Sequence, residues 1–172
     1  MTTVIQACEV KSVASQKNNV SEVDIRERED RTIKDAKSIL FQRLMQTELI
    51  LLNPSVSKDF LLMELSQKES EEFHALFLDN QHRLIKAKKL FKGTIDQCNI
   101  YPREVVKAAL ELNAAAIIFA HNHPSQQAEP SQSDITVTKR LIDALALLDI
   151  RVLDHFIVGG TSVVSFAELG LI

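Results

Sequence analysis

An apolar run that leads directly into two histidines is the feature that most constrains the fold of this chain. Residues Ala115–Ala120 are all apolar and are followed at once by His121-Asn122-His123-Pro124. A fully apolar segment of this length is typical of a strand buried on both faces of a sheet. Polar residues that follow such a strand are well placed to carry chemistry. We therefore expect an α/β domain with a functional site at the end of this strand.

His121 and His123 are candidate ligands of one metal ion. Residues two apart on extended backbone point the same way, so both imidazoles can bind a single ion at about 2.0–2.1 Å. Asp134 follows in the first turn of a predicted helix, after a loop that contains Pro124 and Pro130, and can add a carboxylate. Three protein ligands with a free fourth position are typical of a hydrolytic zinc site. We predict Zn²⁺ here, although Fe²⁺ accepts the same ligand set.

Each part of this pattern also has an ordinary structural interpretation. The segment Ser131-Gln132-Ser133-Asp134 is a capping box, in which Ser131 caps a helix and Asp134 bonds back from the third helical position. An isolated His-x-His pair is more often a polar feature of the surface than a metal site. The occurrence of both after a buried strand, with two prolines in the loop between them, favours the metal.

The remaining apolar patterns predict one domain with a mixed β-sheet sandwiched by helices. Helix-like and strand-like spacings follow one another along the chain, separated by short turns. The predicted helices cover Ile33 to Asn53-Pro54, a short segment capped by Ser57, residues 102–112 and residues 131–148. The predicted strands cover residues 73–79, 84–91, 115–120, 151–158 and 163–166.

The N-terminal segment has a different composition. Ten of the fifteen residues Ser21–Asp35 are Asp, Glu, Lys or Arg, so this segment buries too little apolar surface to offset the entropy lost on ordering. We interpret residues 1–31 as a mobile arm or a frayed helix, residues 32–56 as an N-terminal helix and residues 57–172 as the folded domain.

Composition and charge exclude several classes of function. The 172 residues are 45% hydrophobic and 25% charged, and no apolar run approaches the ~20 residues of a membrane helix, so we expect no membrane partner. A net charge of −3 argues against the broad basic surface of a nucleic-acid-binding protein, and DNA binding is not supported. The two cysteines, Cys8 and Cys98, are far apart, and Met1–Val10 has no basic start followed by a long apolar stretch, so we expect a cytoplasmic protein.

The candidate ligands resemble a known metalloprotease signature. His121-Asn122-His123-Pro124-Ser125-x4-Pro130-Ser131-x2-Asp134 is similar to the JAMM motif as it occurs in the RadC family of bacterial JAB, or MPN-like, domains. Further similar segments extend the resemblance from about Ser57 to Ile172: Phe91-x-Gly93-Thr94, Pro102-Arg103-Glu104-Val105, Leu112–Ala116 and Arg151–Gly159.

Two features depart from the family pattern. The family usually has glycine where this chain has Gln126, which affects the path of the loop or the access of substrate. The helix-hairpin-helix module of full-length members is not recognisable in residues 1–56, so the chain resembles a short form with the catalytic domain only.

The resemblance implies a cytidine-deaminase-like fold and a zinc-dependent peptidase or isopeptidase, in which a zinc-activated water attacks an amide of a peptide or protein substrate. A glutamate at the start of the first core strand serves as the base in such enzymes, and Glu71 occupies this place, with Glu72 as the fallback. Ser131 is expected to hydrogen-bond the oxyanion, unless it is only a helix cap. The pair Asp154-His155 either supports the site or is a structural polar pair.

Two functions from other classes are also compatible with this resemblance. MPN domains can be catalytically silent interaction modules, although the silent members have usually lost the three ligands that this chain keeps. A DNA-repair accessory role rests only on the historical naming of RadC proteins, because no phosphate-binding or base-reading feature is visible in the sequence.

Overall fold

The computed structural model describes residues 22–46, 54–93 and 99–172. The chain divides between Ile33 and Lys34 into two units, and helix α1 (Glu22–Gln46) spans the division. The helix begins eleven residues before the predicted Ile33, and the part of the predicted arm up to residue 21 lies outside the described residues. Acidic and basic residues spaced four apart, such as Asp24 and Arg28, favour a helix even in a segment that is mostly charged. The division into segments at residues 31 and 56 stays a prediction.

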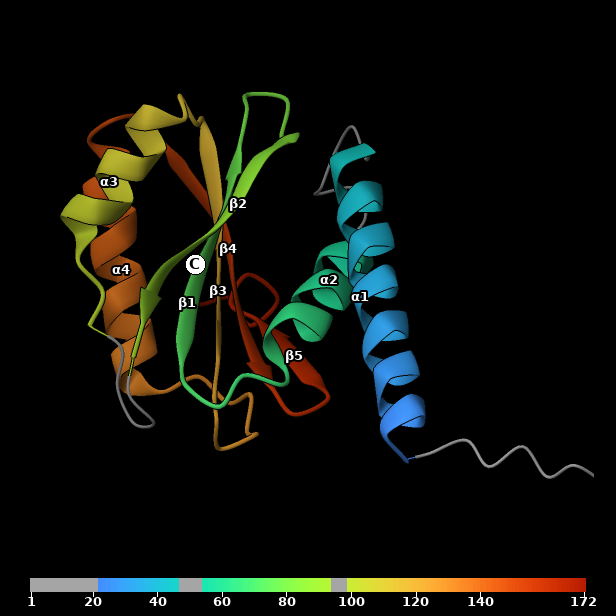
Figure 1. Cartoon of the computed structure of the whole chain (residues 1–172). Coiled ribbons are helices and arrows are strands. Elements are labelled where there is room, and N and C mark those ends of the chain that lie inside the picture. Colours follow the sequence, from blue (N-terminus) through green and yellow to red (C-terminus); the bar gives the residue numbers. More distant parts are fainter. Residues whose placement is uncertain (1–21, 47–53, 94–98) are drawn as a thin grey trace, which may run out of the picture. The chain divides into compact units, whose positions relative to one another are not determined.

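A five-stranded mixed sheet forms the centre of the unit 34–172 (Figure 1). Its strands lie in the order β2-β1-β3-β4-β5, and only β3 and β4 are parallel neighbours. Every residue of β3 is buried, because this strand is central and both faces of the sheet are covered. The strands are β1 (Glu72–Leu78), β2 (Leu84–Lys92), β3 (Ala116–Asn122), β4 (Arg151–Gly159) and β5 (Ser162–Ser165).

Helices cover the two faces of this sheet. Figure 1 shows α3 (Pro102–Glu111) and α4 (Gln132–Ala146) side by side on one face, and α2 (Pro54–Leu65) on the other. Two separate apolar cores result, one containing Leu61 of α2 and the other containing Leu141 of α4. The predicted α/β class, with a mixed sheet between helices, is confirmed.

Two local predictions differ from the structure. Ser57 does not cap the second helix, because α2 begins at Pro54, a residue suited to a first helical turn, and Ser57 is buried within the helix. The strand β3 continues beyond the apolar run through Asn122. It does so because His121 is paired on both sides, with Phe73 of β1 and Ile157 of β4.

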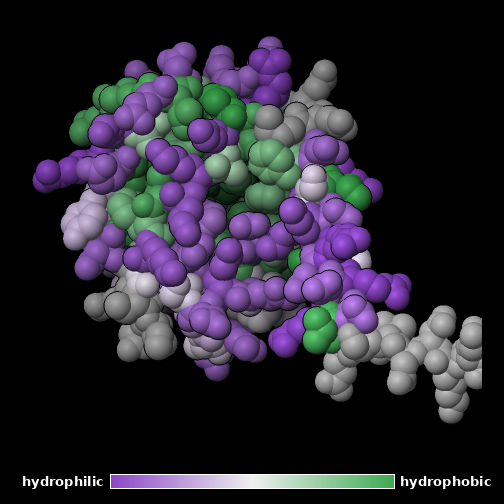
Figure 2. Space-filling view, in the orientation of Figure 1, coloured by the Kyte–Doolittle hydropathy of each residue, from purple (hydrophilic) through white to green (hydrophobic). Residues whose placement is uncertain are grey.

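The surface is mainly polar on the face shown in Figure 2, and its hydrophobic residues gather over α3. Leu110, near the end of α3, is 57% exposed. Among the helices in the described ranges, none combines the length and the apolarity that crossing a bilayer requires.

Deletion of residues 1–30 should change the thermal midpoint of the remaining chain by no more than about 3 °C. The reason is that residues 23–30 are all exposed and therefore contribute little buried surface. Differential scanning calorimetry of the full and shortened chains measures the effect. A loss well beyond this range would show that the segment packs against the domain.

Candidate metal centre

Strand alternation at the end of β3 places the two histidines on one face of the sheet and Asn122 on the other. The odd-numbered residues Ile117 and Phe119 pack in the core under α3 and α4, whereas Ile118 and Ala120 pack in the core under α2. His121 continues the first series and stacks on Phe73, with ring centroids 6.1 Å apart. The ligand pair therefore faces α4, which carries Asp134 in its first turn.

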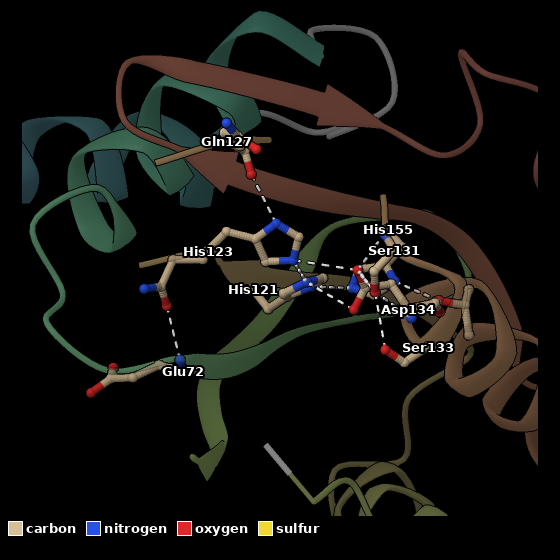
Figure 3. A network of polar contacts seen from close by, with 10 residues as sticks. Glu72, His121, His123, Gln127, Ser131, Ser133, Asp134 and His155 are labelled. Atoms are coloured by element: carbon tan, nitrogen blue, oxygen red, sulfur yellow. Dashed lines mark hydrogen bonds and ion pairs between the residues drawn. The ribbon is translucent and has the colours of Figure 1, made fainter. Parts of the chain in front are cut away.

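The three candidate ligands meet at one point (Figure 3). The Nε2 atoms of His121 and His123 lie 2.9 Å apart, and each lies 3.3 Å from a carboxylate oxygen of Asp134. Ligand atoms of a tetrahedral ion with bonds of about 2.1 Å lie roughly 3.4 Å from one another. The spacing and the donor chemistry therefore fit a divalent metal ion, and this group of residues could hold one.

A chain of buried hydrogen bonds presents the correct nitrogen of His121. The hydroxyl of Thr138 donates to the carbonyl of Asp134 at 2.6 Å, so its oxygen accepts from Nδ1 of His155, also at 2.6 Å. Complete burial lowers the pKa of His155 well below its ordinary value and keeps this ring neutral. Its Nε2 therefore accepts from Nδ1 of His121 at 2.9 Å. The Nε2 lone pair of His121 is left free for a metal.

A backbone carbonyl does the same for His123. Nδ1 of His123 donates to the carbonyl of Gln127 at 2.8 Å, which leaves Nε2 directed at the other ligands. The loop that carries Gln127 lies so close to β4 that a Cβ on Gly159 would come within 2.5 Å of the backbone carbon of Gln127. Gln126 adopts a φ of 64°, in the left-handed region that glycine enters without cost. The loop therefore takes a glycine-like path despite the substitution.

The capping box orients the Asp134 carboxylate. Ser131 caps α4, and its backbone N–H and hydroxyl both donate to Oδ2 of Asp134, at 2.8 and 2.6 Å. The same carboxylate faces His121 and His123. The two interpretations of this motif are therefore compatible, since one side chain closes the capping box and completes the ligand group.

The charges of the ligand group are strongly coupled. Burial opposes ionisation of Asp134, but the adjacent imidazoles of His121 and His123 hold its pKa far below the ordinary value. The hydrogen bond to Asp134 correspondingly raises the pKa of His123, against the effect of burial. A proton on Nε2 of His123 would lie where a metal ion binds, so the ion and the proton compete for this nitrogen.

Glu71 and Glu72 lie in different surroundings. Glu71 is half-buried and lines the same cleft as His123 and Asp134. Burial raises the pKa of the Glu71 carboxyl, with a smaller contribution from Asp134. Glu72 is buried, and its carboxylate contacts Nζ of Lys89 at 3.2 Å and Nε2 of His74 at 3.1 Å, which lower its pKa although burial opposes them.

A cleft of about 1000 Å³ adjoins the ligand group. Glu71, His123 and Asp134 line it, together with Ser131 and residues of α4. The free position of a bound metal would therefore be accessible to a ligand as large as a peptide segment.

Sequence reasoning missed Asn122, which is 3% exposed and lies on the opposite face from the histidines. Its Oδ1 accepts from the backbone N–H of Glu72 at 2.8 Å, and its Nδ2 donates to the carbonyl of Ser70 at 3.1 Å. Asn122 lies between the two histidines at the end of a buried strand, and a buried polar side chain needs hydrogen-bond partners. This requirement could have identified Asn122 from the sequence.

The pair Asp154-His155 also divides between two roles. His155 supports the ligand group, whereas Asp154 accepts from the hydroxyl of Ser165 at 2.6 Å and from the backbone N–H of Ala167 at 3.0 Å. Asp154 therefore anchors the C-terminal segment, and both interpretations of the pair hold, one for each residue.

A model of the RadC-like JAB domain matches residues 51–171 of this chain, and the chain belongs to this family. A UPF0758 protein from Vibrio cholerae is 54% identical over 142 residues, which are 83% of this chain and 89% of that protein. UPF0758 proteins from Methylibium petroleiphilum and Vibrio parahaemolyticus are 56% and 59% identical over 80% and 71% of this chain. The chain matches only 61% and 54% of the lengths of these two relatives. The resemblance inferred from the motif is thus confirmed.

Metal affinity should fall about tenfold per pH unit below the raised pKa of His123 and level off above it, because the ion must displace the proton that Asp134 stabilises. Isothermal titration calorimetry with Zn²⁺ at several pH values measures this slope.

Elemental analysis should find close to one ion per wild-type chain and none in His123→Ala. Ser125→Ala, an exposed change in the same loop, should keep the ion. Stoichiometric metal in His123→Ala would contradict the ligand group.

Proposed function

We propose that this chain is a zinc-dependent hydrolase of amide bonds, a peptidase or isopeptidase, with His121, His123 and Asp134 as the zinc ligands. The observation that carries the proposal is the convergence of two imidazole Nε2 atoms and one carboxylate on a point that opens into the cleft. A zinc ion held there supplies a Lewis acid that polarises a carbonyl and lowers the pKa of water toward ~7.

In this proposal Glu71 is the general base. Its carboxylate accepts the proton of the attacking water and returns it to the leaving amine. A raised pKa suits this task, because a carboxyl that titrates nearer neutral pH both accepts and releases a proton readily. The contacts of Glu72 with Lys89 and His74 favour Glu71, since a carboxylate held in those ion pairs is a weaker base.

Asn122 positions Glu71 rather than touching substrate. Its hydrogen bonds hold the backbone on either side of Glu71, at the carbonyl of Ser70 and the N–H of Glu72. The carbonyl of Glu71 itself accepts from the N–H of Gly93 at 2.8 Å. The backbone around Glu71 is thereby hydrogen-bonded to Asn122 of β3 and to Gly93, which follows β2. These bonds fix the position of the proposed base, and catalytic rates depend strongly on such positioning.

Ser131 is the proposed donor to the oxyanion. Its hydroxyl lies at the rim of the cleft and donates to Asp134 at 2.6 Å, so it must turn from that carboxylate to stabilise a developing negative charge. The cap formed with the backbone N–H of Asp134 is retained in either orientation of the hydroxyl hydrogen.

Glu71→Gln should leave the zinc content unchanged and reduce turnover by about a hundredfold or more, because the amide cannot accept the proton of water. Glu72→Gln is the matched control and should retain turnover. The assay uses a fluorogenic peptide selected from a library with the wild-type protein, and elemental analysis follows the metal. Normal hydrolysis by Glu71→Gln with loss in Glu72→Gln would assign the base to the neighbouring residue.

Asn122→Ala should lower kcat about tenfold to a hundredfold in the wild-type background and have no further effect in Glu71→Gln, because it acts through Glu71. Hydrogen exchange of the Glu72 amide should accelerate in the variant, since its acceptor is removed. Equal losses in both backgrounds would show that Asn122 supports the fold in general and not the base.

A further inference from the structure

One face of α4 forms a wall of the cleft beside the ligand group. Ser133, Thr136, Val137 and Arg140 line the cleft, and these positions follow the spacing of three and four residues that brings side chains onto one helix face. The buried face of the same helix carries Thr138, Leu141 and Leu145, and also Asp134 in the first turn, where it borders the cleft. The wall therefore begins in the helical turn that carries the candidate ligand Asp134 and extends to Arg140.

Arg140 is the only lysine or arginine among the described residues that line this cleft. In the part of the chain that the structure describes, its guanidinium takes part in no ion pair or hydrogen bond. Asp143, three residues farther along the helix, is a possible partner by spacing but does not pair with it. An arginine with five unused donors thus borders a cleft whose other ionisable groups include Glu71 and Glu129.

The position of Arg140 on α4 sets its distance along the helix axis from Asp134. Arg140 lies six positions after Asp134, which corresponds to about 9 Å along a helix axis at 1.5 Å per residue. An extended peptide advances about 3.3 Å per residue, so this distance equals about three substrate residues. A peptide whose scissile amide lay at an ion held by Asp134 and the two histidines would therefore bring a group about three residues away to Arg140.

We propose that Arg140 is a carboxylate-binding subsite, and that the substrate is a peptide with a carboxylate about three residues from the cleaved amide. This inference rests on the proposed hydrolase function. A planar guanidinium binds a carboxylate through two parallel hydrogen bonds, which gives both charge pairing and orientation. Its ligand is either the C-terminal carboxylate of a short peptide or the side chain of Asp or Glu.

Peptide hydroxamates test the subsite, because the hydroxamate binds the metal and fixes the register of the probe. One pair carries the hydroxamate at the N-terminal end and finishes, three residues later, in a carboxylate or a carboxamide. A second pair has a Glu or Gln side chain at the third residue and no free terminal carboxylate, and is made with the hydroxamate at either end. Affinities are measured with the zinc-loaded full chain by calorimetry.

Arg140→Gln should weaken one carboxylate probe about tenfold or more and its neutral counterpart less than twofold. Lys139→Gln removes the same charge from the adjacent position, which does not line the cleft, and should change neither. Response of the terminal pair identifies a peptide end as the ligand, and response of the Glu and Gln pair identifies an acidic side chain. Equal changes for all probes in Arg140→Gln, or no change, would overturn the subsite.

Cleavage assays separate this inference from the proposed function. If carboxylate probes bind through Arg140 but the corresponding amides are never cleaved, the subsite stands and the hydrolase activity fails. If peptides are cleaved equally well with and without the carboxylate, the activity stands and the subsite fails.

Discussion

The antiparallel pairing of β1 with β3 is the constraint on which the rest of the site depends. This pairing sets Phe73 opposite His121, so the chain entering β1 passes beside the last residues of β3. Glu71 consequently lines the same cleft as His123, and the N–H of Glu72 meets the amide of Asn122. A shift of this register by one residue would turn the side chains of one strand to the opposite face of the sheet. The candidate ligands would then be separated from the proposed base.

Burial makes the polar groups of this region dependent on one another. His121, His155 and Thr138 are almost inaccessible, and an unpaired polar atom in such surroundings costs about 1–3 kcal/mol. The hydrogen bonds from His121 through His155 and Thr138 to the carbonyl of Asp134 leave each group with a partner. The same bonds select one tautomer for each ring, so the structural requirement and the requirement of metal binding coincide.

The capping box shows how a common structural motif can also form part of a candidate metal site. Asp134 closes the box with Ser131 at the start of α4, as its place in the motif predicts. Since β3 ends opposite that helix start, the oxygens of the same carboxylate also face two histidines. Evidence for a helix cap was therefore no evidence against a ligand.

Periodicity and motif spacing in the sequence determined the α/β class, most strand positions, the family and the candidate ligand group of His121, His123 and Asp134. These features are local or depend on short spacings, which a single sequence displays directly. Only the tertiary structure decided that Glu71 and Glu72 have different surroundings, that Asn122 holds the backbone beside Glu71, and that Arg140 borders the cleft. These contacts are between segments that are distant in the sequence, namely β3 with the segment before β1, and α4 with the loops around it. They depend on strand register and helix rotation, because one residue of shift in a strand or a helix turns a side chain toward a different neighbour.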